Sequence, residues 1–214
     1  MTNDVKPHTA AAGGRGQART RLARRAVIDA ARSLFVDRGY TPTTVDAISA
    51  RADVPPATVY RLFSSKLGIL EALLDTSIAG DDQPVPVQDR SEVAALFAEA
   101  DPRELLAGFS RVTTAINERT SDVYRVLVGA AGSDAGAAQV LAEIHRQRDA
   151  GQRRIARALA HTKALRRGMR ERDAADLIHA LMSPDLYRLL VVDRGWKPPR
   201  YRQWLTDTLI QQLL

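Results

Sequence analysis

Residues 43–66 constrain the fold of this chain more than any other stretch, because two helix starts and a tight turn follow one another within it. Thr43 can cap a helix N-terminus, and Asp46 three residues later gives a capping box with aspartate in place of the usual glutamate. Asp53 then occupies the turn, and a proline pair suits the first positions of the next helix, where a missing N–H costs nothing. The pattern predicts two short helices joined by a tight turn, with a third helix starting at the end of the stretch.

The second helix of this pair is expected to have two different sides. Val59, Leu62 and Phe63 recur at helical spacing and form its apolar side. A helix that presents small and polar groups at its N-terminal end, braced by a crossing helix, has the geometry that enters a DNA major groove. The residues left on or near the outer side are Pro55, Ala57, Thr58 and Arg61.

Basic residues are concentrated on the same part of the chain. Residues 1–66 hold 11 Lys and Arg against 5 Asp and Glu, an excess of +6, whereas residues 67–214 hold 20 of each kind. A solubilising basic tail would give the same excess, but its coincidence with the two-helix pattern favours a surface for nucleic-acid phosphates. Arg19 and Arg21 extend this excess toward the N-terminus, where they could contact the DNA backbone or simply be solvated.

Composition and spacing exclude several other classes of protein. The chain has no cysteine, which excludes disulfides, thiolate zinc sites and a cysteine nucleophile. No apolar run approaches the roughly 20 residues that span a bilayer, and the N-terminus has no hydrophobic signal core, so we expect a cytoplasmic protein without a membrane partner. We find no H-E-x-x-H spacing, nucleophile elbow or Gly-rich phosphate loop, and therefore expect no metal, no cofactor and no catalytic site.

Helical periodicity continues along most of the chain. Residues 1–18 lack apolar periodicity, and we expect them to be disordered. Polar, proline-containing residues 80–90 are the best candidate for a domain boundary. No strand-like alternation of useful length occurs, so the fold class is all-α, with about ten helices. Besides the two helices of residues 43–66, helices are expected at about 20–37, 65–78, 91–99, 103–118, 121–130, 135–164, 172–182, 184–194 and 198–213.

One ordered set of motifs resembles the DNA-binding region of the TetR-family transcriptional repressors. It begins at Arg21 and continues through L-F-V-D-R-G-Y, T-T-V-D-A-I-S-A-R-A-D-V, T-V-Y-R-L-F and S-S-K. The set covers about residues 20–74 and is specific as a whole, although no single motif would be. Near the C-terminus, S-P-D-L-Y-R-L-L-V-V-D-R-G-W is similar to regulatory domains of the same family.

The resemblance implies an all-helical homodimer that acts as a ligand-responsive repressor of a palindromic operator. In this chain it implies a basic arm at residues 1–18, a helix-turn-helix DNA-binding domain at 19–66, and a helical-bundle domain at 67–214 that binds ligand and dimerises. The alternative is an all-α small-molecule-binding protein or enzyme that uses the same scaffold without binding DNA. The clustered basic charge argues against that alternative.

The resemblance also implies a role for individual residues at the DNA. Thr44 and Tyr60 would contact phosphates, and Lys66, at a helix N-terminus, would add a charge and a backbone amide to another phosphate. Thr58 and Arg61 would face the groove. The complete predicted DNA-binding set is Thr44, Pro55, Pro56, Ala57, Thr58, Tyr60, Arg61, Lys66, Arg19 and Arg21.

The tip of the second helix departs from the family pattern. Asp53 and Ala57 stand where the family often has glycine, and Pro55 and Pro56 stand where it commonly has polar residues. The two prolines remove two backbone donors near the DNA. They leave apolar contacts, such as those with thymine methyl groups, as the expected mode of base recognition at the tip.

Apolar residues at core-like spacings in residues 67–214 are the expected walls of a pocket for a small, largely apolar effector. Taken singly, each would fit plain core packing. Arg148 lies on the apolar side of its helix, where it could meet an acidic ligand or pair with an internal carboxylate. The candidate effector-binding set is Phe109, Val112, Tyr124, Leu127, Val128, Ile144, Arg148 and Leu181.

The last helices carry the expected dimer interface, as the resemblance implies. The predicted interface residues are Leu177, Leu181, Leu186, Leu189, Leu190, Trp204, Leu205 and Leu209.

Overall fold

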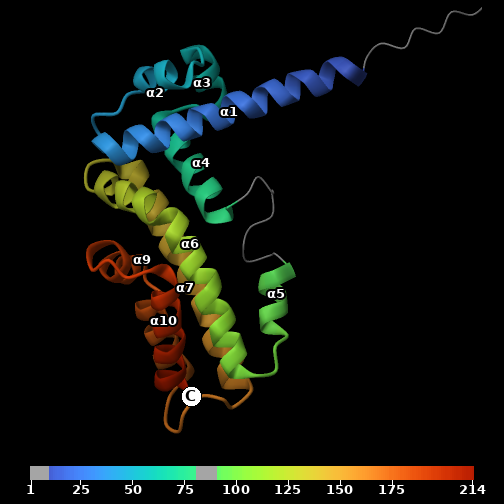
Figure 1. Cartoon of the computed structure of the whole chain (residues 1–214), viewed down its shortest axis with the longest axis vertical. Coiled ribbons are helices and arrows are strands. Elements are labelled where there is room, and N and C mark those ends of the chain that lie inside the picture. The colour runs from blue at the N-terminus through green and yellow to red at the C-terminus, as the bar shows by residue number, and fades with distance from the viewer. Residues whose placement is uncertain (1–9, 81–90) are drawn as a thin grey trace, which may run out of the picture. The chain divides into compact units, whose positions relative to one another are not determined.

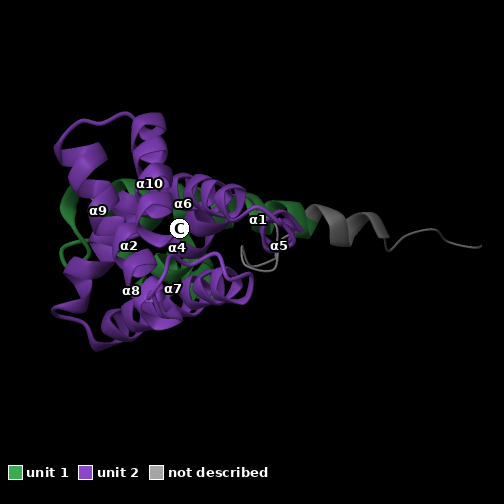
Figure 2. Cartoon of the chain, turned by 90° about the horizontal axis from the view of Figure 1, so that it is seen from below, with its two compact units in different colours: residues 1–73 green, residues 74–214 purple. Residues whose placement is uncertain are grey.

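The computed structural model describes residues 10–80 and 91–214, and every regular element within them is a helix (Figure 1). The all-α prediction is therefore confirmed. The chain divides into two compact units, Met1–Leu73 and Leu74–Leu214 (Figure 2). The elements are α1 (Ala10–Arg38), α2 (Val45–Ala52), α3 (Pro56–Phe63), α4 (Lys66–Ala79), α5 (Ser91–Phe97), α6 (Pro102–Ala131), α7 (Ala135–His161), α8 (Glu171–Leu181), α9 (Pro184–Tyr187), the π-helix η2 (Arg188–Asp193) and α10 (Pro198–Leu213).

The first unit is built around the contact of α1 with the α2–α3 pair. Phe35 and Ile48 are completely buried between α1 and α2, and Val59 on α3 is almost completely buried. The ring of Phe35 also packs on the ring of Tyr40, with 5.6 Å between their centroids. These apolar residues fix α2 and α3 against a long supporting helix, which is the helix-turn-helix arrangement that the sequence predicts.

The start of α2 lies one residue later than predicted. Thr44 is the N-cap, because its Oγ1 accepts a hydrogen bond from the Ala47 amide at 3.1 Å. Thr43 is buried instead, and its hydroxyl donates to the Gly39 carbonyl oxygen at 2.8 Å. The predicted capping box is therefore wrong, because Asp46 is not three residues after the cap, although its charge still suits the first turn of a helix.

The turn between α2 and α3 depends on Asp53, which adopts a left-handed conformation (φ 52°, ψ 42°). Its amide donates to the Ala50 carbonyl oxygen, and the next amide, of Val54, donates to the Ser49 carbonyl oxygen. The Ser49 hydroxyl in turn donates to the Val54 carbonyl oxygen. Val54 is buried, so this short network sets the angle at which α3 leaves α2.

Replacing Asp53 by glycine is expected to raise the free energy of unfolding by about 0.5 kcal/mol. A β-carbon costs about 1 kcal/mol in the left-handed region, and the greater freedom of glycine in the unfolded chain offsets part of this gain. Arg51→Gly, two residues earlier on the exposed side of α2, is the matched control and is expected to lose about 1 kcal/mol. Urea unfolding followed by circular dichroism compares them, and a loss of stability in Asp53→Gly would contradict the strain argument.

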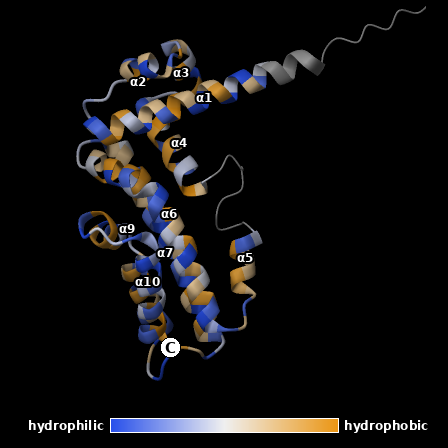
Figure 3. Cartoon of the chain, in the orientation of Figure 1, coloured by the Kyte–Doolittle hydropathy of each residue, from blue (hydrophilic) through white to orange (hydrophobic). Residues whose placement is uncertain are grey.

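The second unit is a helical bundle with a large apolar core to which α5, α6, α7, α8, α9 and α10 contribute. The core includes Leu106 on α6, Leu159 on α7, Ile178 on α8 and Leu205 on α10, none of which is exposed to solvent. Figure 3 shows orange and blue residues interspersed along α6 and α10, as expected for helices with one buried side. None of the described helices combines the length and apolar character that a membrane crossing requires.

Several helix boundaries of the second unit differ from the sequence predictions. The helices predicted at 103–118 and 121–130 form the single helix α6, in which the Thr120 hydroxyl donates to the Ile116 carbonyl oxygen and is accommodated without a break. The helix predicted at 135–164 ends at His161, just before Lys163 adopts a positive φ of 56°. The helix predicted at 184–194 is a short α-helix that continues as the π-helix η2.

Helix α1 begins at Ala10, whereas the sequence predicts disorder for residues 1–18. Alanine has the highest helix propensity, and adding residues to a helix that tertiary packing already holds is easier than starting one, so the helix extends beyond its packed part. Residues 1–9 lie outside the described residues. Of the boundary predicted at 80–90, residues 81–90 also lie outside them, and Gly80 ends α4 with a positive φ of 75°.

Candidate functional site

Helix α3 buries one side against α1 and α2 and leaves the other to solvent. Val59 and Phe63 are buried, whereas 51% of Tyr60 is exposed. Arg61 is exposed beside it and forms no ion pair in the part of the chain that the structure describes. The predicted outer residues Pro55, Pro56 and Ala57 are also exposed, and Thr58 is half-buried. The helix therefore presents one phenol, one free guanidinium and a small apolar tip.

Lys66 begins α4 and is already engaged within the first unit. Its ammonium donates to the carbonyl oxygens of Tyr40 at 3.0 Å and Thr41 at 3.3 Å, and lies 4.2 Å from the centroid of the Tyr40 ring. The side chain therefore fastens the start of α4 to the loop that leads into α2. A phosphate contact by this residue would use its backbone amide and the field of its charge, since the ammonium already has two acceptors.

The predicted contacts on α1 and α2 are accessible. Arg19 and Arg21 are exposed on α1, and Thr44 is exposed at the start of α2. The Thr44 oxygen accepts the Ala47 amide, which leaves its hydroxyl hydrogen able to donate to a phosphate oxygen. Arg24, which is absent from the predicted set, lies 4.8 Å from the centroid of the Phe63 ring and connects α1 to α3. Arg24 follows Arg21 by three residues, and residues three apart lie on the same side of a helix. This spacing is the sequence signal that could have added Arg24 to the predicted set.

The second unit contains a cavity of about 460 Å³ among α4, α5, α6, α7 and the start of α9. Of the predicted effector-binding residues, Phe109, Val112, Tyr124, Ile144 and Arg148 line it. The cavity therefore lies where the sequence placed an effector pocket, between the bundle helices. Its volume falls within the range of about 300–1,000 Å³ that small-molecule sites occupy.

Three predicted effector residues do not line this cavity, and we remove them from the set. Leu127 on α6 is completely buried and does not line the cavity. Val128 points the other way and is 44% exposed. Leu181 is half-buried against the main core of the unit. An apolar residue at helical spacing can face the core, the solvent or a cavity, and spacing alone does not distinguish these.

Sequence reasoning missed several polar residues of the cavity. Thr113, Asn117 and Thr120 on α6 line it together with Phe109 and Tyr124. These positions recur at steps of three and four, so the apolar periodicity that identified Phe109 and Val112 also indicated them. Small polar side chains at such positions fit a solvated side of a helix equally well, so the spacing alone does not assign them to a cavity.

Burial shifts the pKa values of polar groups in and beside the cavity. It raises the pKa of Tyr124 and lowers the pKa of His145, and the Tyr124 hydroxyl and His145 Nε2 form a hydrogen bond of 2.9 Å. Burial also lowers the pKa of Arg148 from its ordinary value, while the charges of Tyr124 and Asp185 act in the opposite direction. An arginine nevertheless stays protonated at neutral pH, so Arg148 brings a positive charge to an apolar cavity.

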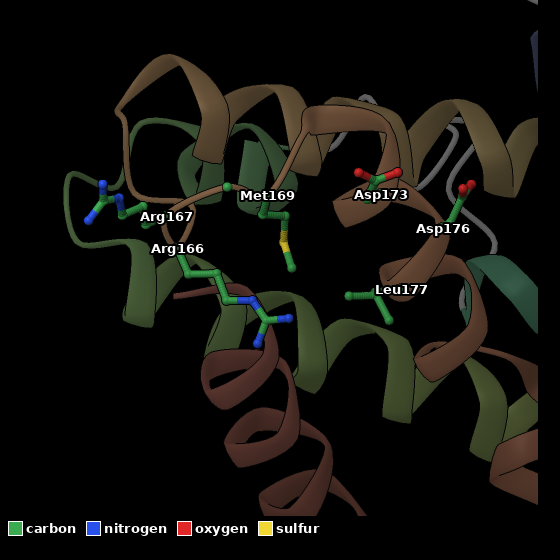
Figure 4. Close-up of a pocket in the computed structure, with 7 residues that line it drawn as sticks. Arg166, Arg167, Met169, Asp173, Asp176 and Leu177 are labelled. Carbon is green, nitrogen blue, oxygen red and sulfur yellow. The ribbon is translucent and has the colours of Figure 1, made fainter.

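A second depression lies between the loop after α7 and helix α8. Figure 4 shows Met169 and Leu177 pointing into it, with Arg166 and Arg167 toward one side and Asp173 and Asp176 toward the other. Its lining is mostly charged, and one of its aspartates, Asp173, pairs with Arg170. It lacks the apolar wall of the α4–α7 cavity, which therefore remains the candidate effector site.

The predicted dimer-interface residues fall into three groups according to their burial. Leu205 and Leu209 are completely buried in the core of the second unit, so they are removed from the interface set because no partner could reach them. Leu189 is 47% exposed on η2, where Arg188–Asp193 contains no buried residue despite four consecutive apolar side chains. The remaining predicted residues are half-buried: Leu177, Leu181, Leu186, Leu190 and Trp204.

Known proteins resemble the chain across both units. The family model described as bacterial regulatory proteins, tetR family, matches residues 27–73. The HTH-type transcriptional regulator YdeS of Bacillus subtilis (strain 168) is 29% identical over 180 residues, which cover 83% of each chain. NalD, the secondary repressor of the MexAB-OprM multidrug efflux pump in Pseudomonas aeruginosa, superposes with a TM-score of 0.71 over 91% of this chain and 98% of its own, at 19% identity. SmeT in complex with triclosan gives a TM-score of 0.64 over 90% and 91%, at 20% identity.

The comparisons agree with the geometry of the first unit. Residues 27–73 contain the buried contact of α1 with α2, the Asp53 turn and the exposed side of α3. In the described residues, no cluster of His, Asp or Glu could hold a metal ion. The helix-turn-helix, the excess basic charge and the matching relatives lead to one identification: the chain is a DNA-binding transcriptional regulator whose residues 27–73 match the tetR family.

Proposed function

We propose that this regulator is a cytoplasmic, homodimeric repressor that releases a palindromic operator when a small effector fills the cavity of its second unit. One observation carries the proposal: helix α4 belongs to both units. It begins at Lys66 beside the helix-turn-helix, and its residues Leu74 and Ile78 line the cavity. A molecule in the cavity therefore contacts the same helix that leads out of the DNA-binding domain.

The end of α4 is held by a specific contact that an effector could alter. Arg119 on α6 donates from Nε to the Ser77 carbonyl oxygen at 3.1 Å and from Nη2 to the Ile78 carbonyl oxygen at 3.0 Å. These acceptors belong to the last turn of α4, which has no further helical partners for its carbonyl groups. The last turn of α4 can take up different positions, and an effector that binds more tightly to the protein in one of them would favour that position. Only such differential affinity can couple the cavity to the DNA-binding domain.

The proposed operator contact uses the exposed side of α3. Tyr60 and Thr44 donate to phosphates, Arg61 reaches a base edge or a phosphate, and the tip formed by Pro55 and Pro56 makes apolar contacts. Arg19, Arg21, Thr58 and the backbone of Lys66 complete the surface, together with Ala57. In a dimer the two α3 helices enter successive major grooves, so the operator is an inverted repeat with half-sites about one helical turn apart.

Two relatives support the finer parts of the proposal. NalD is a repressor, and SmeT has been crystallised with triclosan, a small molecule. Both share the fold of this chain over nine-tenths of its length. We propose that the second unit binds its ligand without transforming it, since the residues around the cavity combine apolar walls with isolated hydrogen-bonding groups.

A gel shift with the DNA just upstream of the gene tests this function. We expect the purified protein to bind an inverted repeat there and to lose affinity steeply as salt increases, because phosphate contacts release counterions. Scrambling one half-site should weaken binding strongly, whereas scrambling the spacer should not. Equal affinity for the repeat and for shuffled DNA of the same composition would contradict specific operator recognition.

A further inference from the structure

The cavity of the second unit contains hydrogen-bond donors that lack acceptors. Asn117 is 4% exposed, and its Nδ2 has no hydrogen-bond partner in the part of the chain that the structure describes. Arg148 makes a single hydrogen bond among the described residues, from Nη2 to the Met182 carbonyl oxygen at 3.4 Å. Both residues line the cavity. Buried donors are normally satisfied, so an occupant that supplies acceptors completes this site.

The charge of Arg148 selects an anionic acceptor. A guanidinium has five N–H donors in a planar fork that matches a carboxylate, and this one uses one donor in a long contact. In the described residues no carboxylate lies within ion-pair distance of it, and the carboxylate that acts on it, that of Asp185, does so at longer range. An unpaired cation in an apolar cavity gains most from an anion that enters with the ligand.

The second arginine of the cavity has a different environment. Arg154 is exposed, and its guanidinium stacks on the Phe97 ring at 3.8 Å from the centroid. It already has an aromatic partner and solvent, whereas Arg148 is half-buried beside Tyr124 and Ile144. The anion site is therefore at Arg148 and not at the cavity rim.

The rest of the cavity accepts an apolar body. Its walls include Phe109, Val112, Ile116, Ile144 and Ile155, from two facing helices. We propose that the ligand is an apolar carboxylic acid whose carboxylate is bound by Arg148, with Asn117 Nδ2 as a further donor. Calling this ligand the effector rests on the proposed function. Its binding does not, because binding can be measured without DNA.

Matched acids and amides test the inference directly. Isothermal titration of the full-length protein with octanoate, decanoate and naphthoate, and with the corresponding primary amides, compares ligands of equal shape that differ in charge. We expect at least one acid to bind about ten- to a hundredfold more tightly than its amide. Arg148→Met should remove this preference and Arg148→Lys should retain part of it, because the lysine keeps the charge and loses the fork.

Arg146→Met is the matched control, two residues away on the same helix. Arg146 is exposed and donates to Glu143, so its loss should leave the preference for acids unchanged. If no acid binds, if acids and amides bind equally, or if Arg148→Met keeps the preference while its circular dichroism matches the parent protein, the inference is overturned. Operator release is scored separately: acids that bind through Arg148 without releasing DNA would support the site and contradict the ligand-responsive repressor.

Discussion

Replacing Leu189 by glutamate is expected to convert the proposed homodimer to monomers and to weaken operator binding by about a hundredfold or more. Leu189 and Val192 are 47% and 60% exposed on η2, which places two large apolar side chains in water on one short element. Such a patch marks an interaction surface, and burying a glutamate in it leaves an unpaired charge. Operator affinity falls as well, because two linked DNA-binding units bind with an avidity that a single unit lacks. Sedimentation velocity gives the oligomeric state, and a gel shift gives the affinity.

Val128→Glu is the control for this experiment. Val128 is 44% exposed on α6, so the substitution adds the same charge to an apolar residue of similar exposure outside η2. We expect that variant to remain dimeric. If Leu189→Glu also stays dimeric at micromolar concentration, η2 is not the interface. A charge at Leu209 would not test the interface, because that side chain is in the core and its replacement would destabilise the second unit by several kcal/mol.

The helix-turn-helix was largely predictable from sequence because local chemistry defines it. Prolines, a capping threonine and apolar residues at helical spacing each act within a few residues, so the order and approximate bounds of α2 and α3 follow from them. The choice between Thr43 and Thr44 as the cap was not predictable. Both can cap a helix, and only the tertiary position of the Gly39 carbonyl gives Thr43 a different hydrogen bond.

Roles that depend on long-range packing were predicted less well. From sequence alone Lys66 is predicted to be an exposed basic residue. Its ammonium instead donates to the carbonyl oxygens of Tyr40 and Thr41, 26 and 25 residues earlier in the chain. Leu205 and Leu209 have the same helical spacing as interface residues, and nothing local shows that α6 and α8 cover them. Asn117 became a candidate only when the structure placed its unpartnered Nδ2 in the cavity. Which neighbour meets each side of a helix is a property of the whole bundle.

Replacing Tyr60 by phenylalanine is expected to weaken operator binding by about tenfold per protomer without changing the fold. The ring is 51% exposed on α3, so the hydroxyl contributes nothing to the core and its loss removes only a donor to a phosphate. Tyr60→Ala should weaken binding further, because it also removes the exposed ring that we propose packs on the DNA backbone. Fluorescence anisotropy with labelled operator measures both variants. Val36→Ala, a partly exposed apolar residue on α1 of the same unit, is the control and should bind like the parent protein.

Salt dependence then separates the role of Tyr60 from that of Arg61. A neutral hydroxyl releases no counterion, so Tyr60→Phe should lower the affinity by the same factor at every salt concentration. Arg61→Gln removes a cation that has no ion pair in the described residues, and it should reduce the slope of log affinity against log salt by about two for a dimer if the guanidinium binds phosphate. An unchanged slope with relaxed sequence preference would instead assign Arg61 to a base edge. Full operator affinity in Tyr60→Ala would show that α3 does not approach the DNA through this side.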